Sequence, residues 1–289
     1  MDQNYIIATA STCDLTQEYL TKHNIPFIGY SYVINDEVFT DDCSEKTRSD
    51  IYKKMREGAI LSTSAINEFT YEEFFEGLIK TGKDVIFLDM CRPLSSSYRF
   101  CDEAIEELKE NYPDRRIVNV DTCCVSGGLG LLVEHAIKLY EDGRTMQEVL
   151  DYIDENKLKI AHRFTVDDLN WLKRGGRVSN ASALVGTLLS IKPVLYVPDD
   201  GSLVAASKIR GRKNALNAII DSIKKDGITE PVFKINHADC LEDAQYVRDK
   251  LLEDFPNASI SISGLGVVIG AHCGPGLFTI FYMTDKRNA

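Results

Sequence analysis

The chain has 289 residues and a formal net charge of -11, because 44 Asp and Glu residues outnumber 33 Lys and Arg residues. Hydrophobic residues make up 44% and charged residues 27%, which is typical of a globular protein with one large or two smaller domains. No apolar run approaches the roughly 18 residues of a membrane span, and no basic region precedes the short N-terminal apolar stretch. We therefore expect a cytoplasmic protein without membrane insertion.

The eight cysteines predict neither disulfides nor a metal site. Nothing in the sequence indicates export, so we expect the thiols to be reduced. Cys123 and Cys124 are adjacent, Cys91 and Cys101 are ten residues apart, and no C-x-x-C motif occurs. The spacing therefore gives no reason to expect a structural metal ion.

The first half of the chain alternates between strand and helix patterns. Short apolar and aromatic runs predict strands at 5–9, 25–35, 84–90 and 115–121. Helical spacing of apolar residues predicts helices over 14–23, 71–82, 97–112 and 126–143. This alternation predicts an α/β domain over 1–160, with a mostly parallel sheet and helices on both faces.

The pattern changes in the second half, after a predicted helix at 145–157. The remaining strands are predicted at 157–166, 192–197, 202–210, 231–237, 258–263 and 277–283, and the helices at 214–225 and 241–255. The turn at 198–201 joins its flanking strands as an antiparallel pair. We therefore expect a second α/β domain over 161–289, with a mixed or antiparallel sheet.

Small hydroxyl residues gather at 10–14, 61–64, 93–98 and 121–128. Carboxyl ends of parallel strands share one sheet edge, where hydroxyls and helix N-terminal N–H groups suit an anionic oxygen. Helix capping demands the same residue types, so both interpretations stay open. "SGGLG" at 126–130 resembles half of a dinucleotide-binding fingerprint, but close helix–strand packing explains it as well.

Cations concentrate between residues 169 and 213, where eight Lys or Arg and two Asp give a net charge of +6. The acidic remainder repels nucleic acid and few aromatic residues are interleaved, so a local anion site is favoured over a nucleic-acid interface. Arg177, Arg210 and His272 lie in glycine-rich stretches and suit a phosphoryl group. A solvated basic face and a structural histidine are the alternatives. The apolar run 179–197 is either core or the wall of a pocket for an apolar tail.

Taken together, these motifs resemble those of the DegV family of bacterial fatty-acid-binding proteins. The resemblance covers nearly the whole chain and rests on "STCDL", "STS", "PLSSSY", "LKRGGRVSNASALVGTLLSIKPVL", "SKIRGRKNAL" and "VVIGAHCGPG". It implies the EDD fold, two α/β domains with a fatty acid such as palmitate, stearate or oleate buried between them. It implies no other cofactor.

The resemblance also implies a role for particular residues. The fatty acid carboxylate is expected at Thr63, Ser64, Ser95 and Ser96. The phosphoryl or head group is expected at Arg177, Arg210 and His272. The implied function is that of a non-catalytic carrier, which presents the carboxylate to a separate fatty acid kinase for phosphorylation to acyl phosphate.

The departures from the family pattern include Ala10 before the first motif, Ile66 in place of a proline, and Ser96 in place of a glycine. These changes bear on chain-length preference and kinase coupling. The alternative function is a stand-alone acyl phosphatase or hydrolase, with Ser95 as nucleophile and His272 as base. The sequence does not show that these two side chains meet.

Overall fold

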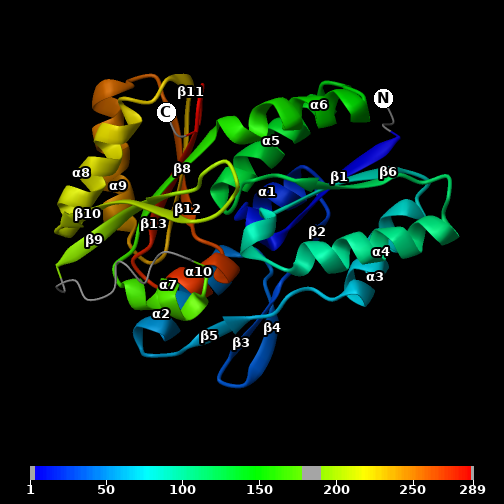
Figure 1. The fold of residues 1–289 in the computed structure, drawn as a ribbon, viewed down its shortest axis with the longest axis horizontal. Coiled ribbons are helices and arrows are strands. Elements are labelled where there is room, and N and C mark those ends of the chain that lie inside the picture. Colours follow the sequence, from blue (N-terminus) through cyan, green and yellow to red (C-terminus); the bar gives the residue numbers. More distant parts are fainter. Residues whose placement is uncertain (1–3, 178–189, 288–289) are drawn as a thin grey trace.

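The computed structural model describes residues 4–177 and 190–287. The first large sheet is parallel, with strand order β2 (Phe27–Ile28), β1 (Tyr5–Ala10), β6 (Asp84–Asp89) and β7 (Ile117–Asp121). Its strands come from the first half of the chain and alternate with helices, as the sequence predicts (Figure 1).

The second large sheet is mixed. Its order is β10 (Val204–Arg210), β9 (Ile191–Tyr196), β8 (Ile160–Thr165), β13 (Phe278–Thr284), β11 (Ile228–His237) and β12 (Ser259–Gly264). Strands β9 and β10 are antiparallel, while β11 and β12 are parallel. The expected α/β fold class with a parallel and a mixed sheet is thus confirmed.

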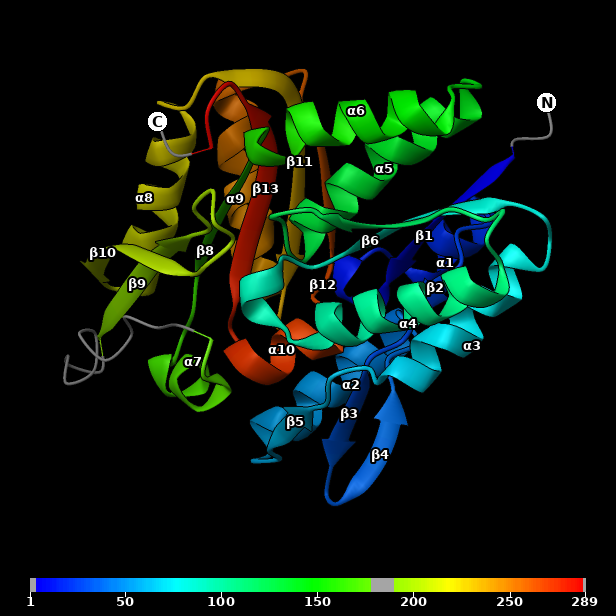
Figure 2. The same ribbon diagram turned by 45° about the vertical axis from the view of Figure 1, so that its right-hand side comes forward.

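A third, antiparallel sheet corrects the prediction of one extended segment at 25–35. It contains β4 (Glu37–Thr40), β3 (Ser31–Ile34) and β5 (Leu61–Thr63), so that β2 and β3 belong to different sheets. The chain turns between them at Gly29, where a Cβ atom would lie 2.5 Å from Thr40 Cγ2 and 2.6 Å from the Asp41 carbonyl oxygen. Only glycine fits this crossing. The β3–β4 hairpin projects from the body of the protein (Figure 2).

Helices separate and cover the two large sheets (Figures 1 and 2). Helices α3 (Glu68–Ile79) and α4 (Ser97–Asn111) pack on one face of the parallel sheet. Helix α5 (Gly127–Glu141) lies between the two sheets and contributes Leu129, Leu132 and Val133 to a shared core. Helices α8 (Arg212–Ile223) and α9 (Leu241–Asp254) cover the far face of the mixed sheet.

The remaining helices are α1 (Gln17–Lys22), α2 (Glu45–Arg56), α6 (Met146–Asn156), α7 (Leu169–Gly175) and α10 (Val267–Cys273). The predicted helix at 14–23 begins later than expected, because Thr16 caps α1 while Asp14 ends a short 3-10 turn at Ser11–Cys13. Along the described part of the chain, no helix combines the length and apolar character needed to span a bilayer.

The glycines of "SGGLG" are a packing motif. A Cβ at Gly127 would lie 2.1 Å from Asn236 Oδ1, and one at Gly128 would lie 2.3 Å from His162 Nε2. A Cβ at Gly130 would lie 2.6 Å from the carbonyl oxygen of residue 13. The N-terminus of α5 therefore approaches the mixed sheet and the first loop too closely for side chains, which confirms the packing interpretation over the dinucleotide one.

The two large sheets use separate parts of the chain, and we propose 1–160 and 161–289 as the two domains. Buried Arg48 joins them. Its guanidinium donates to the Leu15 carbonyl at 2.8 Å in the first part and to the Gly264 carbonyl at 2.8 Å in the second. Such buried charge-assisted bonds hold the two parts in a fixed relation.

Candidate functional site

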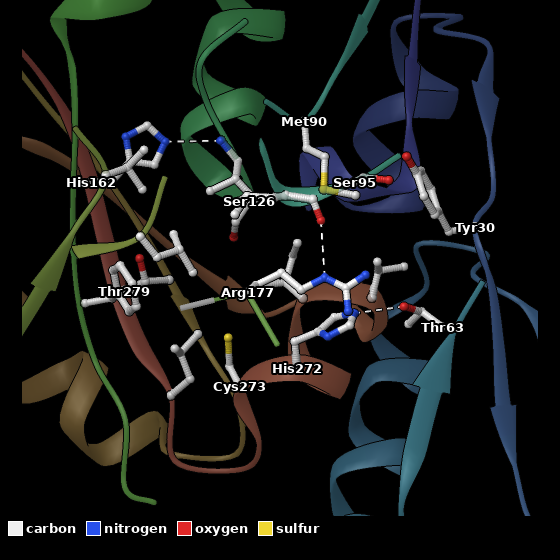
Figure 3. A pocket seen from close by; sticks show the side chains of 18 of the residues that line it. Tyr30, Thr63, Met90, Ser95, Ser126, His162, Arg177, His272, Cys273 and Thr279 are labelled. Atoms are coloured by element: carbon white, nitrogen blue, oxygen red, sulfur yellow. Dashed lines mark hydrogen bonds between the residues drawn. The ribbon is translucent and has the colours of Figure 1, made fainter. Parts of the chain in front are cut away.

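A cavity opens between the two large sheets, beside helix α10 (Figure 3). It holds about 890 Å³ of space, its mouth included. Apolar side chains make up much of its wall. Phe164 and Phe281 belong to the mixed sheet, Leu277 precedes β13, and Met90, Leu94 and Val125 lie in the segments that follow strands β6 and β7. An apolar cavity with a few convergent polar groups is the usual form of a small-molecule site.

All four residues predicted to hold a carboxylate line this cavity. Thr63 ends strand β5 and Ser64 follows it, whereas Ser95 and Ser96 directly precede helix α4. Residues 61–63 form a strand of the small antiparallel sheet, and not the end of a parallel strand. The two pairs therefore meet from different sheets, and not along a single sheet edge.

The buried side chain of Ser97 holds the two hydroxyl pairs together. Its hydroxyl oxygen accepts a hydrogen bond from the Ile66 amide at 3.1 Å. It also accepts one from the Ser95 hydroxyl at 3.0 Å, while the Ser97 amide donates to Ser95 Oγ at 3.2 Å. The segment after Thr63 is thus tied to the N-terminus of α4, whose free N–H groups favour a negative charge.

Thr63 and His272 form the central polar contact of the cavity mouth, with Thr63 Oγ1 and His272 Nε2 2.8 Å apart. The other side of the ring faces Gly175, whose backbone accepts a hydrogen bond from it. We therefore assign the ring proton to Nδ1, so that Nε2 accepts the Thr63 hydroxyl proton. Burial, together with the positive charge of Arg177, lowers the pKa of His272 to about 4. The imidazole is neutral at pH 7.

Arg177 lies at the mouth of the cavity next to His272 (Figure 3). Its Nη1 donates to the Gly175 carbonyl at 2.7 Å, and its Nε donates to the Leu94 carbonyl at 3.3 Å. The side chain thus bridges the end of α7 and the loop before Ser95 while remaining exposed. This position suits contact with an anionic head group.

The other predicted cations are dispersed. Arg210 is exposed at the end of β10 and is not among the described residues that line the cavity. Arg174 stacks over Trp171, with 4.1 Å from its guanidinium carbon to the ring centre. Of the described cations between residues 169 and 213, only Arg177 lines the cavity. The apolar run 179–197 falls largely on 178–189, outside the described residues.

Asp89 is a supporting residue that the sequence did not reveal. It ends strand β6, is buried, and accepts hydrogen bonds from Thr12 at 2.6 Å, Tyr30 at 2.7 Å and the Met90 amide at 2.7 Å. Burial raises the pKa of its carboxyl group. Tyr30 and Met90 line the cavity, so Asp89 fixes two parts of its wall. An aspartate at the end of an apolar run was the only sequence signal.

A strained loop follows strand β7. Cys123 and Ser126 have positive φ angles of 51° and 56°. Ser126 lines the cavity, and its hydroxyl donates to Asp14 Oδ2 at 2.5 Å. Burial raises the pKa of Asp14 to about 7. Backbone strain of this kind persists where surrounding contacts impose it, often at functional sites.

The sequence model of the DegV family, described as uncharacterised proteins, matches residues 5–285. The chain belongs to the DegV family. A DegV domain-containing protein of Clostridium perfringens is 38% identical over 288 residues, which are 99% of each chain. One of Streptococcus pyogenes is 33% identical over 278 residues, 96% of this chain and 97% of that one.

Solved DegV structures share the fold. A structure described as fatty acid binding of a DegV family protein from Thermus thermophilus has a TM-score of 0.87 and 26% identity, covering 98% of this chain and all of that one. DegV, a fatty acid binding protein from Bacillus subtilis, has a TM-score of 0.82, 26% identity and the same coverage. The fatty acid kinase B3 protein of Streptococcus pneumoniae, loaded with linoleic acid, has a TM-score of 0.84 at 23% identity and supports the fold.

The departures from the DegV pattern have visible structural effects. Ile66 is buried against the core under α3, and its amide donates to Ser97, a bond that proline could not form. Ala10 is fully buried at the end of β1. Ser96 is exposed before α4 and makes no capping hydrogen bond, so its hydroxyl is available at the cavity mouth. Of these three replaced positions, Ser96 adds a polar group at the mouth, whereas Ala10 and Ile66 are part of the core.

Proposed function

We propose that this DegV protein binds a long-chain fatty acid in the cavity between its sheets. The carboxylate lies at Thr63, Ser64, Ser95 and Ser96, and the tail lies along the apolar wall. The observation that carries this proposal is the convergence of four hydroxyl residues and His272 at one end of an apolar cavity. The fatty acid binding described for the Thermus and Bacillus proteins of the same fold supports it.

The tail and the carboxylate of the ligand contribute differently to binding. Each buried methylene contributes about 0.8 kcal/mol, so the tail supplies most of the affinity. A hydrogen bond to a carboxylate contributes about 1.5 to 3 kcal/mol and fixes the direction of the chain. The hydroxyls at the mouth therefore determine which end of the ligand faces outward.

We infer further that the protein is a cytoplasmic carrier that presents the carboxylate to a separate fatty acid kinase. Arg177 is exposed at the mouth, next to the neutral His272, and its positive charge is placed to neutralise a phosphoryl group. Arg210 lies outside the cavity wall and would serve on the surface that the kinase approaches. The name of the pneumococcal fold relative, a fatty acid kinase B protein, agrees with such a partner.

The hydrolase alternative is disfavoured by the hydrogen bonds of its two candidate residues. Ser95 donates to Ser97, whereas His272 pairs with Thr63. A nucleophile needs a direct hydrogen bond to its base, and a base works best with a pKa near the operating pH. The pKa of His272, about 4, lies well below that range.

Extraction of the purified protein with organic solvent, followed by mass spectrometry, tests fatty acid binding directly. We expect one long-chain fatty acid per chain, because release would expose the whole tail to water. Delipidated protein should gain in melting temperature when palmitate or oleate is added. Lipid-free protein whose melting temperature does not respond would contradict the proposal.

The carrier function is tested with a partner kinase and ATP. Arg177→Ala should leave fatty acid binding nearly intact and lower acyl phosphate formation at least about tenfold, the loss of a charge-assisted bond. Arg174→Ala is the matched control, because Arg174 stacks on Trp171 away from the cavity wall. If the wild type hydrolyses acyl phosphate without the kinase, and His272→Ala abolishes this hydrolysis, the carrier proposal is wrong and the hydrolase alternative holds.

A further inference from the structure

The cavity wall opposite Thr63 contains a further polar residue, Thr279. Strand β13 points Phe278, Ile280 and Tyr282 toward α8 and α9, so that Thr279 and Phe281 face the cavity. Thr279 is 4% exposed. Within the described parts of the chain its hydroxyl has no hydrogen-bond partner. Figure 3 shows Thr279 across the cavity from Thr63.

The surroundings of Thr279 show which polar groups a ligand can reach. His162 is fully engaged, because its Nε2 accepts from the Val125 amide at 3.2 Å and its Nδ1 donates to the Ile160 carbonyl at 2.9 Å. Cys273 lines the cavity, and burial raises the pKa of its thiol to about 12. The thiol therefore stays protonated and is at most a weak donor. Thr279 is the strong unpaired group on this wall.

An unpaired hydroxyl in an apolar wall disfavours a plain hydrocarbon tail. The hydroxyl faces the open cavity, and a hydrocarbon tail would cover it without giving it a partner, which costs free energy. A methyl group of the same shape would pack against the tail without that cost. A ligand oxygen at this point would satisfy the hydroxyl. Sites that hydrogen-bond a ligand oxygen discriminate strongly against ligands that lack it.

We propose that the cavity selects a fatty acid that carries a hydroxyl or oxo group on its acyl chain, and that Thr279 hydrogen-bonds this oxygen. The inference rests on the proposed fatty acid binding and names the ligand class within it. Thr279 can donate to either oxygen type and can also accept from a hydroxyl. Because the carboxylate is fixed at Thr63 and Ser95, an oxygen can reach Thr279 only if it is attached to one particular region of the acyl chain.

The test measures the dissociation constants of stearate, of hydroxystearates with the hydroxyl at successive chain positions, and of the matching oxostearates. Wild type, Thr279→Val and Thr279→Ser are compared, each delipidated. Valine keeps the shape of threonine, while serine keeps the hydroxyl. Thr165→Val is the matched control, because Thr165 is buried in β8 with an unpaired hydroxyl but does not line the cavity.

For wild type we expect the stearates that carry the oxygen at one position, or at two neighbouring positions, to bind more tightly than stearate. Stearates oxygenated elsewhere should show no such gain. Thr279→Val should lower this preference at least about fivefold and strengthen stearate binding, since the tail then covers no unpaired hydroxyl. Thr279→Ser should retain the preference, and Thr165→Val should not change it. Thermal melts confirm that each variant is folded.

Two results would overturn the inference. If stearate binds but no oxygenated position is preferred, or if the preference survives in Thr279→Val, the inference is wrong while fatty acid binding stands. If neither stearate nor any oxygenated acid binds folded wild type, the proposed function itself is wrong and the inference goes with it.

Discussion

The replacement of Thr63 by valine tests the polar mouth of the cavity most directly. Valine keeps the branched shape of threonine and removes one hydroxyl. In the structure that hydroxyl lies 2.8 Å from His272 Nε2, and Thr63 is only half-buried at the end of β5. The change therefore removes one hydrogen-bonding group without opening a cavity in the core.

The expected effect on binding is larger than the effect on stability. A hydrogen bond to a carboxylate contributes about 1.5 to 3 kcal/mol, so the dissociation constant of palmitate or oleate should rise about 10- to 150-fold. The bond between neutral Thr63 and His272 contributes about 0.5 to 1.5 kcal/mol to folding, and water can reach the half-buried imidazole that remains. The free energy of unfolding should fall by no more than that.

The assay is titration calorimetry of delipidated protein at pH 7, with urea denaturation of the ligand-free protein alongside. Thr165→Val again serves as the matched control and should leave fatty acid affinity unchanged. An unchanged palmitate affinity in folded Thr63→Val would remove Thr63 from the carboxylate site. A loss of stability above about 1.5 kcal/mol would show that Thr63 is structural, and the assignment of its proton to His272 would need revision.

Three further predictions concern stability. The pKa of His272 is about 4 in the folded chain and 6.5 in its ordinary range, so protonation favours unfolding. The free energy of unfolding should fall by about 3 kcal/mol as the pH drops from about 6.5 to about 4. In urea denaturation, His272→Gln should not show this pH-dependent loss of stability. Gly128→Ala should cost at least about 1 to 3 kcal/mol in the same assay, because its Cβ would lie 2.3 Å from His162. Arg48→Met should cost about 3 kcal/mol or more, since buried Asp14 loses its neighbouring cation; a smaller loss would contradict the interdomain role of Arg48.

The sequence was a good guide to single elements but not to how they pair. Periodicity predicted helix α4 and strand β6 with boundaries that differ by one residue, because apolar spacing directly reflects which side chains face the core. It failed at 25–35, where Gly29 sends the chain from one sheet to another. A close backbone crossing depends on residues 40 and 41, which no local pattern connects with Gly29.

In the candidate site, too, the sequence identified single residues but not which of them come together. The motifs identified Thr63, Ser95, Arg177 and His272, and all four line one cavity. They equally suggested Arg210, which lies apart from the described cavity wall, because a run of cations does not specify which side chains face a ligand. Tyr30 and Thr279 gave no signal, since a single polar residue in or beside a strand is common in any domain.

By itself, the sequence determined the fold class, the polar character of the cavity mouth and the family. These properties depend on local spacing and residue type. Only the tertiary structure decided that Thr63 and His272, 209 positions apart, share one hydrogen bond. It also decided that Asp89 supports the wall and that Thr279 faces the ligand space. Such contacts arise when two sheets close around one helix, and the burial that fixes them is a property of the whole fold.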